Sequence, residues 1–166
     1  MTADQSLRAR LAVPADAVAI TRIYNEGIGE RTATFETRLR TVDEVRAWFE
    51  RRFPVVVIEA DSEVIAFAGT SEYRPRGCYA GIAEFSVYVA REHRRRGAGR
   101  AAMGMLIEAA RAAGFWKLVS RVFVENDASR TLLRDLHFRE VGIYRRHGQL
   151  DGAWRDVVIV ERLLDE

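Results

Sequence analysis

Three β-strand patterns follow one another in the middle of the chain, with no helical pattern between them. They span residues 55–59, 64–73 and 82–89, and turn residues separate them, Asp61-Ser62 and Arg74-Pro75-Arg76-Gly77. Runs rich in β-branched and aromatic residues with such turns between them are typical of consecutive strands. The pattern predicts an antiparallel meander, so the rest of the chain has to fold around a sheet.

Patterns on both sides of the meander complete the expected order of elements. Before it, residues 7–11 alternate as a strand, Pro14 opens a helical pattern that includes Ile28, and Thr41 and Glu44 form a capping box for a helix through about Phe53. After it, we expect a long helix that ends at Gly114, a strand over 117–124, a short helix over 127–136, strands over 140–146 and 154–163, and a last turn over 147–152.

The resulting order, βααβββαβαββ, predicts an α/β (α+β) fold. Its sheet is mixed and mostly antiparallel, with about seven strands and about four flanking helices. With 166 residues and 48% hydrophobic content, the chain is long enough for one sizeable core, and no break divides the pattern. We expect one domain over residues 1–166.

Composition excludes several classes of protein. The longest apolar runs are far shorter than the roughly 20 residues that span a bilayer, and the N-terminus lacks the pattern of a secretion signal, so a cytoplasmic protein without a membrane partner is expected. Cys78 is the single cysteine, which we expect to pack rather than react, and the three histidines are too far apart for a local zinc motif, so no metal is expected. A net charge of +2 does not favour nucleic acid as a partner.

The segment from residue 89 to residue 100 has the composition of an anion site. A strand ends at Val89, an arginine- and glycine-rich turn follows, and a helix begins near Gly97. Glycines allow a ligand to approach the backbone, and the free N–H groups and dipole of a helix start favour phosphate. A plain turn with a solvated arginine face is the alternative, whereas the spacing fits neither a Walker loop nor a dinucleotide fingerprint.

The turn Arg94-Arg95-Arg96-Gly97-Ala98-Gly99, between a strand and a long helix, resembles the pyrophosphate loop of the GNAT (GCN5-related) N-acetyltransferases. The resemblance implies acetyl-CoA as co-substrate, held by the loop through Arg100 and by the strand residues Val87, Tyr88 and Val89. It also implies a cofactor contact for Asn126, which is equally suited to cap the following helix.

Four further stretches narrow the resemblance: Ile23-Tyr24-Asn25-Glu26, Thr32-Ala33-Thr34-Phe35-Glu36, Glu84-Phe85-Ser86-Val87-Tyr88-Val89 and Gly152-Ala153-Trp154-Arg155-Asp156-Val157. Together they resemble the phosphinothricin and methionine sulfoximine acetyltransferases, a group that includes enzymes acting on arsinothricin. This resemblance implies acetylation of the α-amino group of a small amino acid, resistance to such inhibitors, and a homodimer.

Amide formation requires an uncharged amine, whereas an α-amino group is mostly protonated at neutral pH. Strand alternation places Glu84, Ser86 and Tyr88 on one face of residues 82–89. Glu84 matches the base of this branch, with an ion pair to a neighbouring arginine as the structural alternative. The Val89 N–H is a candidate donor to the oxyanion.

The general acid stays unassigned, because Leu133 occupies the position of the tyrosine that many family members use. His137 falls where the family has a glycine, and we expect an ordinary surface histidine there.

Arginines in the loop before Tyr79 are candidates to bind an anionic substrate group. Arg74 and Arg76 can each form a bidentate fork, with exposed turn arginines as the alternative. Thr34 and Phe35 match residues of the family's amino-acid pocket, although Phe35 is equally suited to a core, and Ser86 shares the face of Glu84. Two other functions remain open: acetylation of a protein N-terminus or polyamine, and acetyl-CoA sensing without transfer.

Overall fold

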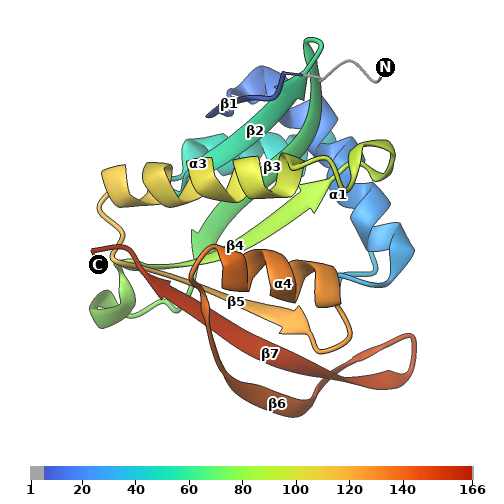
Figure 1. Ribbon diagram of the computed structural model, residues 1–166, viewed down its shortest axis with the longest axis vertical. Coiled ribbons are helices and arrows are strands. Elements are labelled where there is room, and N and C mark those ends of the chain that lie inside the picture. The colour runs from blue at the N-terminus through green and yellow to red at the C-terminus, as the bar shows by residue number, and fades with distance from the viewer. Residues whose placement is uncertain (1–5, 166) are drawn as a thin grey trace.

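The computed structural model describes residues 6–165 and contains a seven-stranded sheet that runs through the whole molecule (Figure 1). Its spatial order is β1-β2-β3-β4-β5-β7-β6. All neighbours are antiparallel except β4 and β5, which are parallel. The strands are β1 (Arg8–Leu11), β2 (Val55–Ala60), β3 (Glu63–Glu72), β4 (Ile82–Val89), β5 (Lys117–Phe123), β6 (Arg139–Leu150) and β7 (Ala153–Leu163).

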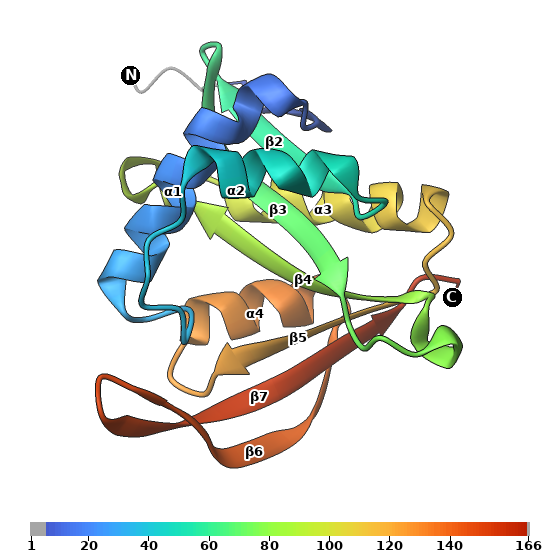
Figure 2. The same ribbon diagram turned by 180° about the vertical axis from the view of Figure 1, so that it is seen from behind.

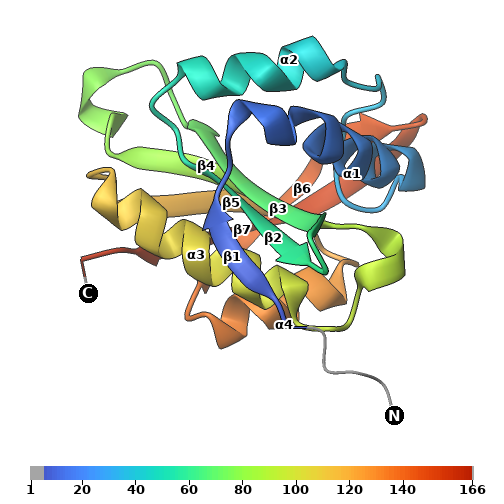
Figure 3. The same ribbon diagram turned by 90° about the horizontal axis from the view of Figure 1, so that it is seen from above.

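Four α-helices cover the two faces of this sheet. α1 (Ala17–Glu30) and α2 (Val42–Arg46) lie on one face, and α3 (Ala98–Ala112) and α4 (Asp127–Asp135) lie on the other (Figures 2 and 3). Short 3-10 turns precede α1 and follow α2. Among the described residues, no helix is long and apolar enough to cross a membrane.

Strand β2 shows why the fold has helices on both faces. Its alternate residues enter different cores: Val56 and Ile58 pack with α3, whereas Val55 and Val57 pack with α1 and α2. A strand that is buried on both faces needs a continuous apolar run rather than an alternating one, which the sequence provides at residues 55–58. Most of the apolar side chains of the long helix α3 are completely buried against the first of these cores.

A buried ion-pair network fastens the start of α1 to the edge of the sheet. Asp16 accepts hydrogen bonds from Arg10 Nη1 at 2.8 Å, from Arg10 Nη2 at 2.9 Å and from the Val13 N–H at 2.8 Å. Arg10 also donates to Glu59 on β2. The hydrogen bonds from Arg10 hold the pKa of the Asp16 carboxyl below its usual value, against the opposing effect of burial.

The sequence predicted the order and type of all these elements correctly. The capping box is confirmed, since the Glu44 N–H donates to Thr41 Oγ1 at 3.2 Å and the Thr41 N–H donates to Glu44 Oε2 at 2.8 Å. The helix that it begins is shorter than expected, however. It tightens to a 3-10 turn over Ala47–Glu50 and ends there rather than at Phe53.

The predicted turn over residues 147–152 was too long. Residues 147–150 belong to β6, and Asp151 and Gly152, both with positive φ, form the whole turn. Gly148 is a strand residue paired with Arg155, and a Cβ atom there would lie 2.8 Å from the ring of Phe35. The glycine therefore permits a close approach between two segments rather than a change of direction.

Strands β4 and β5 form the feature that positions the site. They pair over only three residues each, from Ile82↔Lys117 to Glu84↔Val119, whereas β4 pairs with β3 up to Val89. Beyond Glu84 the two parallel strands diverge, as Figure 1 shows near the centre of the sheet. The sheet is therefore open on one side of β4, next to the turn that leads to α3.

Candidate active site

A cavity of about 650 Å³ opens beside the diverging strands. Glu84, Ser86 and Tyr88 line it from β4, as their predicted common face requires. The segment after α1 contributes Thr34 and Phe35 to the same cavity. Three of the four predicted catalytic and substrate positions in these two segments, Glu84, Ser86 and Thr34, carry polar side chains, so the cavity suits a small polar ligand.

An arginine that the sequence reasoning missed contacts Glu84 in this cavity. Arg121 Nη2 donates to Glu84 Oε1 at 2.6 Å, and Arg121 Nη1 lies 3.4 Å from His147 Nε2. The side chains of Glu84 and Arg121 are 25% and 37% exposed, so ligands can reach both. The ion pair that the sequence left open as an alternative for Glu84 is thus present. In the sequence of β5, Arg121 is the one charged residue between the apolar pairs Leu118-Val119 and Val122-Phe123, and this interruption indicates a functional side chain.

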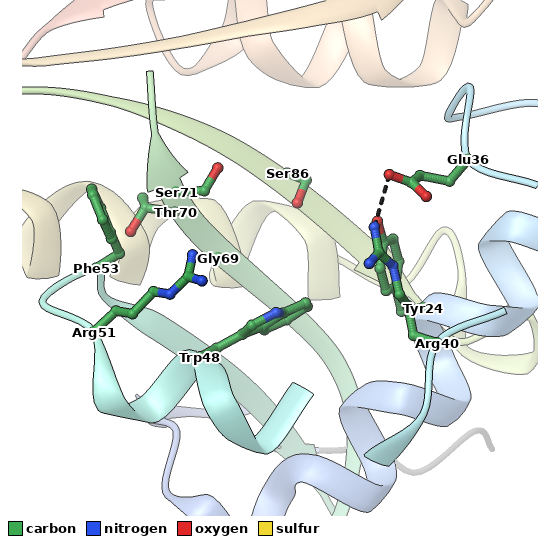
Figure 4. Close-up of a pocket in the computed structure, with 10 residues that line it drawn as sticks. All are labelled: Tyr24, Glu36, Arg40, Trp48, Arg51, Phe53, Gly69, Thr70, Ser71 and Ser86. Carbon is green, nitrogen blue, oxygen red and sulfur yellow. Dashed lines mark hydrogen bonds and ion pairs between the residues drawn. The ribbon is translucent and has the colours of Figure 1, made fainter. Parts of the chain in front are cut away.

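A second cavity of about 280 Å³ adjoins the first and shares Tyr24, Glu36, Ser71 and Ser86 with it. Figure 4 shows its walls, with the side chains of Trp48 and Arg51 extending from the helical segment toward β3.

The other guanidinium of this second cavity belongs to Arg40, which donates to Glu36 Oε1 at 2.8 Å. Its backbone is held by the side chain of Asn25, which exchanges two hydrogen bonds with it. Arg40 Nε is buried and has no hydrogen-bond partner among the described residues. The second cavity therefore combines an aromatic wall with cationic donors, none of which the sequence reasoning had singled out.

Tyr88 is packed on three sides and forms a fixed wall between α1 and the cavity. Its ring stacks on Phe67 with 5.5 Å between ring centroids and meets Tyr24 edge-on at 5.0 Å. A Cβ atom on Gly27 would lie only 2.6 Å from the ring. Burial raises the pKa of the Tyr88 hydroxyl, so this tyrosine stays protonated at neutral pH.

The open edge of β4 carries the backbone groups that the sequence assigned to the cofactor. Ser120 Oγ on β5 donates to the Phe85 carbonyl at 2.8 Å, so this carbonyl points toward β5. Because backbone direction alternates along a strand, the groups of Val87 and Val89 point the same way, into the gap. Strand-like pairing with an extended ligand is therefore possible along this edge.

The predicted anion loop lies at the end of that edge. Gly97 is the N-cap of α3 with φ of +85°, and Ala98 is the first helical residue. Gly99 lets α3 approach its neighbours, because a Cβ atom there would lie 3.3 Å from Leu132. The free N–H groups of the first helical turn face outward from this loop, as an anion site requires.

The arginines of the loop differ in their surroundings. Arg94 donates to both carboxylate oxygens of Glu30 on α1, at 2.8 and 3.0 Å, and its Nε donates to the Val89 carbonyl at 3.2 Å. These arginine contacts, which Arg91 reinforces, lower the pKa of Glu30. Arg94 thus ties the loop to α1.

The remaining arginines of the loop are nearer to solvent. Arg95 and Arg96 are exposed, and Arg100 pairs with Asp135 of α4 at 2.8 Å. Arg95 itself adopts a positive φ of 62°, which turns the chain just before the helix.

The two ends of α4 agree with the helix-capping role suggested for Asn126 and with the surface position expected for His137. Asn126 is its N-cap, and Asn126 Oδ1 accepts a hydrogen bond from the Ser129 N–H at 3.2 Å. Leu133, at the family's tyrosine position, is buried in the core. His137 is exposed with φ of +65° just after α4, the conformation that favours the glycine found there in the family.

The structure does not bring Arg74 and Arg76 into the cavity of Glu84. They line a separate hollow with Arg52 and Tyr79, and the guanidinium of Arg74 lies over the ring of Tyr73. Cys78 is exposed on the same loop, contrary to the expectation that it packs. Within residues 6–165 no cluster of histidine, cysteine or acidic side chains has the make-up of a metal site.

Comparison with known proteins places this arrangement in a family. The chain is 34% identical to an L-methionine sulfoximine/L-methionine sulfone acetyltransferase of Pseudomonas paraeruginosa, with 91% of each chain covered. It is 30% identical to a phosphinothricin N-acetyltransferase of Streptomyces coelicolor, over 99% of this chain and all of the other.

A solved phosphinothricin acetyltransferase from Sinorhizobium meliloti, in complex with acetyl-CoA, superposes with a TM-score of 0.88. It is 30% identical, and the match covers 95% of this chain and 88% of that one. Residues 20–138 match the family described as "Acetyltransferase (GNAT) family". That match spans the diverging strands, the glycine loop and α4. The chain therefore belongs to the GNAT acetyltransferases and is an N-acetyltransferase.

Proposed function

We propose that this enzyme transfers the acetyl group of acetyl-CoA directly to the α-amino group of a phosphinothricin-like amino acid. Phosphinothricin, methionine sulfoximine and arsinothricin are the candidate substrates. The observation that carries the proposal is the position of Glu84, whose carboxylate lies on the wall of a ligand-sized cavity where β4 and β5 diverge. The names of the curated relatives agree with a substrate of this kind.

In the proposed reaction, Glu84 removes a proton from the α-ammonium group, directly or through one water molecule. Acetyl-CoA supplies the thioester, whose carbonyl carbon accepts the amine lone pair, so that a C–N bond forms and a tetrahedral oxyanion results. The C–S bond then breaks, the nitrogen loses its second proton and the thiolate takes up one, so that the whole reaction releases one proton. The N–H of Val89 points into the gap and is our candidate donor to the oxyanion. Ser86 lies at the junction of the two cavities, where a small acceptor has to sit.

We assign the cofactor to the opposite side of the open edge. The edge of β4 at Val87–Val89 holds the pantetheine arm, and the loop from Arg94 to Arg100 holds the pyrophosphate, with Asn126 nearby. The geometry that supports this is the helix start at Gly97, which has a left-handed conformation and where an added Cβ atom would have no neighbour within 4 Å; the first N–H groups of such a helix have no partner within the helix.

Two sets of arginines compete for the polar head of the substrate. Arg74 and Arg76 are the candidates from the sequence. Arg51 is the candidate from the structure, because it lines the cavity that adjoins that of Glu84 and shares Ser86 with it. A tetrahedral anionic head suits either set, since guanidinium groups bind such oxygens in a bidentate manner.

We also propose that the reaction confers resistance to inhibitors of this type and that the enzyme is a homodimer. Strand β6 is an edge of the sheet, and apolar side chains of the β6–β7 hairpin are exposed: Val141, Ile143, Tyr144 and Trp154. Such a surface favours association with a second copy. Sedimentation at micromolar concentration tests the dimer.

A thiol-release assay with a panel of acceptors tests the function. The panel contains phosphinothricin, methionine sulfoximine, arsinothricin, a polyamine and a peptide with a free N-terminus. Turnover of the first three supports the proposal, turnover of the last two alone redirects it to another acceptor, and release with none favours acetyl-CoA sensing.

Glu84→Gln tests the base in the same assay. We expect kcat to fall roughly 10²- to 10³-fold because the proton acceptor is lost, with little change in acetyl-CoA affinity, because the charge that pairs with Arg121 is lost in the acceptor cavity rather than at the loop. Glu108→Gln is the matched control, since Glu108 pairs with Arg111 on α3 and lies outside the cavities. Unchanged turnover in the Glu84 variant would remove this residue from the mechanism.

A further inference from the structure

The ion pair between Arg121 and Glu84 lies inside the cavity that receives the acceptor. Glu84 is the last residue of β4 that pairs with β5, whereas Arg121 follows the last paired residue of β5, and both side chains retain access to solvent. The second nitrogen of the guanidinium lies at the long distance of 3.4 Å from His147 Nε2. The guanidinium therefore uses one of its five N–H donors in a short hydrogen bond to Glu84, and donors on its other edge are available to a ligand.

An α-amino acid carries a matching pair of charges. Its ammonium and carboxylate groups are attached to the same carbon atom, so their separation is comparable to that of a contact ion pair. Placed against Glu84 and Arg121 in the opposite sense, each charge of the zwitterion meets its complement, and the amino-acid end of the substrate adds no net charge to this part of the cavity. Charges that exchange one partner for another in this way avoid most of the desolvation cost of an unpaired ion.

We propose that Arg121 binds the α-carboxylate of the acceptor and in doing so releases Glu84 to act on the α-amine. This inference rests on the proposed function and assigns to β5 a specificity-determining residue for that reaction. The planar guanidinium turns from the single oxygen of Glu84 to the two oxygens of the substrate carboxylate, a bidentate contact that one carboxylate oxygen of Glu84 does not provide.

The exchange makes the α-carboxylate a condition for efficient turnover. An amine without an adjacent carboxylate leaves Arg121 bound to Glu84, and it brings an unbalanced positive charge next to the guanidinium. Such an acceptor therefore meets both a base that is already engaged and a repulsive neighbour. Selection against amines of this kind follows from the pairing itself and needs no steric exclusion.

The test compares an amino acid with two analogues that lack the α-carboxylate charge. The substrates are the best amino acid of the acceptor panel, its α-carboxamide and its decarboxylated amine. In the wild-type enzyme we expect kcat/KM for the amino acid to exceed that for either analogue by roughly 10- to 100-fold, the effect of a charge-assisted hydrogen-bonded pair.

Arg121→Gln should remove this preference. We expect kcat/KM for the amino acid to fall roughly 10- to 100-fold, while that for the decarboxylated amine changes by less than about threefold. Arg121→Lys should restore part of the preference, because it keeps the charge and loses the fork. Arg139→Gln is the control, since Arg139 pairs with Glu161 on the β6–β7 ribbon outside the cavities, and it should leave both values unchanged.

Three outcomes would overturn the inference. Equal losses for the amino acid and the decarboxylated amine in Arg121→Gln would mean that Arg121 only positions Glu84. Equal kcat/KM values for the amino acid and its analogues in the wild-type enzyme would mean that the α-carboxylate is not recognised at all. Lack of turnover of every amino acid would overturn the proposed function together with this inference.

Discussion

Gly27 is the point where helix α1 touches the wall of the active-site cavity, and Gly27→Ala measures how rigid that wall is. The added Cβ atom would lie 2.6 Å from Cδ1 and 2.7 Å from Cε1 of Tyr88. The ring has little room to move, because it stacks on Phe67 and meets Tyr24 edge-on. The helix or the ring therefore has to shift.

The magnitude follows from two opposing effects. Alanine in place of glycine within a helix stabilises the protein by about 0.8–1 kcal/mol, whereas forcing a methyl group into a packed core costs about 1–3 kcal/mol. The net change is a loss of about 0–2 kcal/mol. Gly104→Ala, in the interior of α3 with no atom within 4 Å of the new Cβ, isolates the first effect and should gain about 1 kcal/mol.

Urea unfolding followed by circular dichroism gives both free energies of unfolding. We expect Gly27→Ala to be less stable than Gly104→Ala by about 1–3 kcal/mol, and a difference of 2 kcal/mol corresponds to about 4–8 °C in Tm for a chain of this size. Displacement of Tyr88 should also raise KM for the acceptor in Gly27→Ala alone. If the Gly27 variant is as stable as the Gly104 variant, the packing of Tyr88 is not rigid and the reasoning fails.

Three further changes probe the fold, the loop and the substrate. Asp16→Asn should lower the free energy of unfolding by about 1–3 kcal/mol at pH 7, since it breaks the ion pair with Arg10. Because the folded-state pKa of Asp16 is depressed, the wild-type protein has its full stability advantage above about pH 4, the ordinary aspartate value, and loses it as the pH falls further. A stability difference that does not depend on pH would contradict this. Gly97→Ala should lose about 1–2 kcal/mol to left-handed backbone strain and weaken acetyl-CoA binding in calorimetry, and full affinity would argue against this loop. Arg74→Ala and Arg76→Ala should raise KM for an anionic amine in the thiol-release assay without changing kcat, and unchanged KM values would place head-group recognition in another cavity.

Local signals were sufficient to predict most of the fold. The capping box at Thr41 and Glu44 fixed one helix start, and Gly97 and Gly114 marked the two ends of α3 with the positive φ angles that glycine tolerates. These devices act within a few residues, so the sequence displays them directly.

The errors have tertiary causes. Gly148 is of a residue type common in turns, yet it lies in a strand and leaves room for the ring of Phe35, more than a hundred positions earlier in the chain. Arg94 keeps its place in the predicted phosphate loop, and its ion pair with Glu30 on α1 is a further tertiary contact that the loop sequence does not indicate. Neither partner is recognisable from the neighbouring sequence.

The candidate site divides in the same way. Glu84 followed from strand alternation and a family motif, because both are local. Arg121 acquires its importance only through the short parallel pairing of β4 and β5, which sets it beside Glu84. Arg51 and Trp48 likewise line the same cavity as Ser86 only because the segment after α2 folds over β3.

The contact between Glu30 and Arg94 links the two ligand sites mechanically. Glu30 is the last residue of α1, and the chain continues from it into the segment that contributes Thr34 and Phe35 to the acceptor cavity. Arg94, in the anion loop, holds that end of the helix through two hydrogen bonds. We therefore expect a ligand that orders the loop to order the acceptor segment as well, so that the second ligand loses less conformational entropy on binding. Such coupling would be reciprocal, with each co-substrate raising the affinity for the other by the same factor.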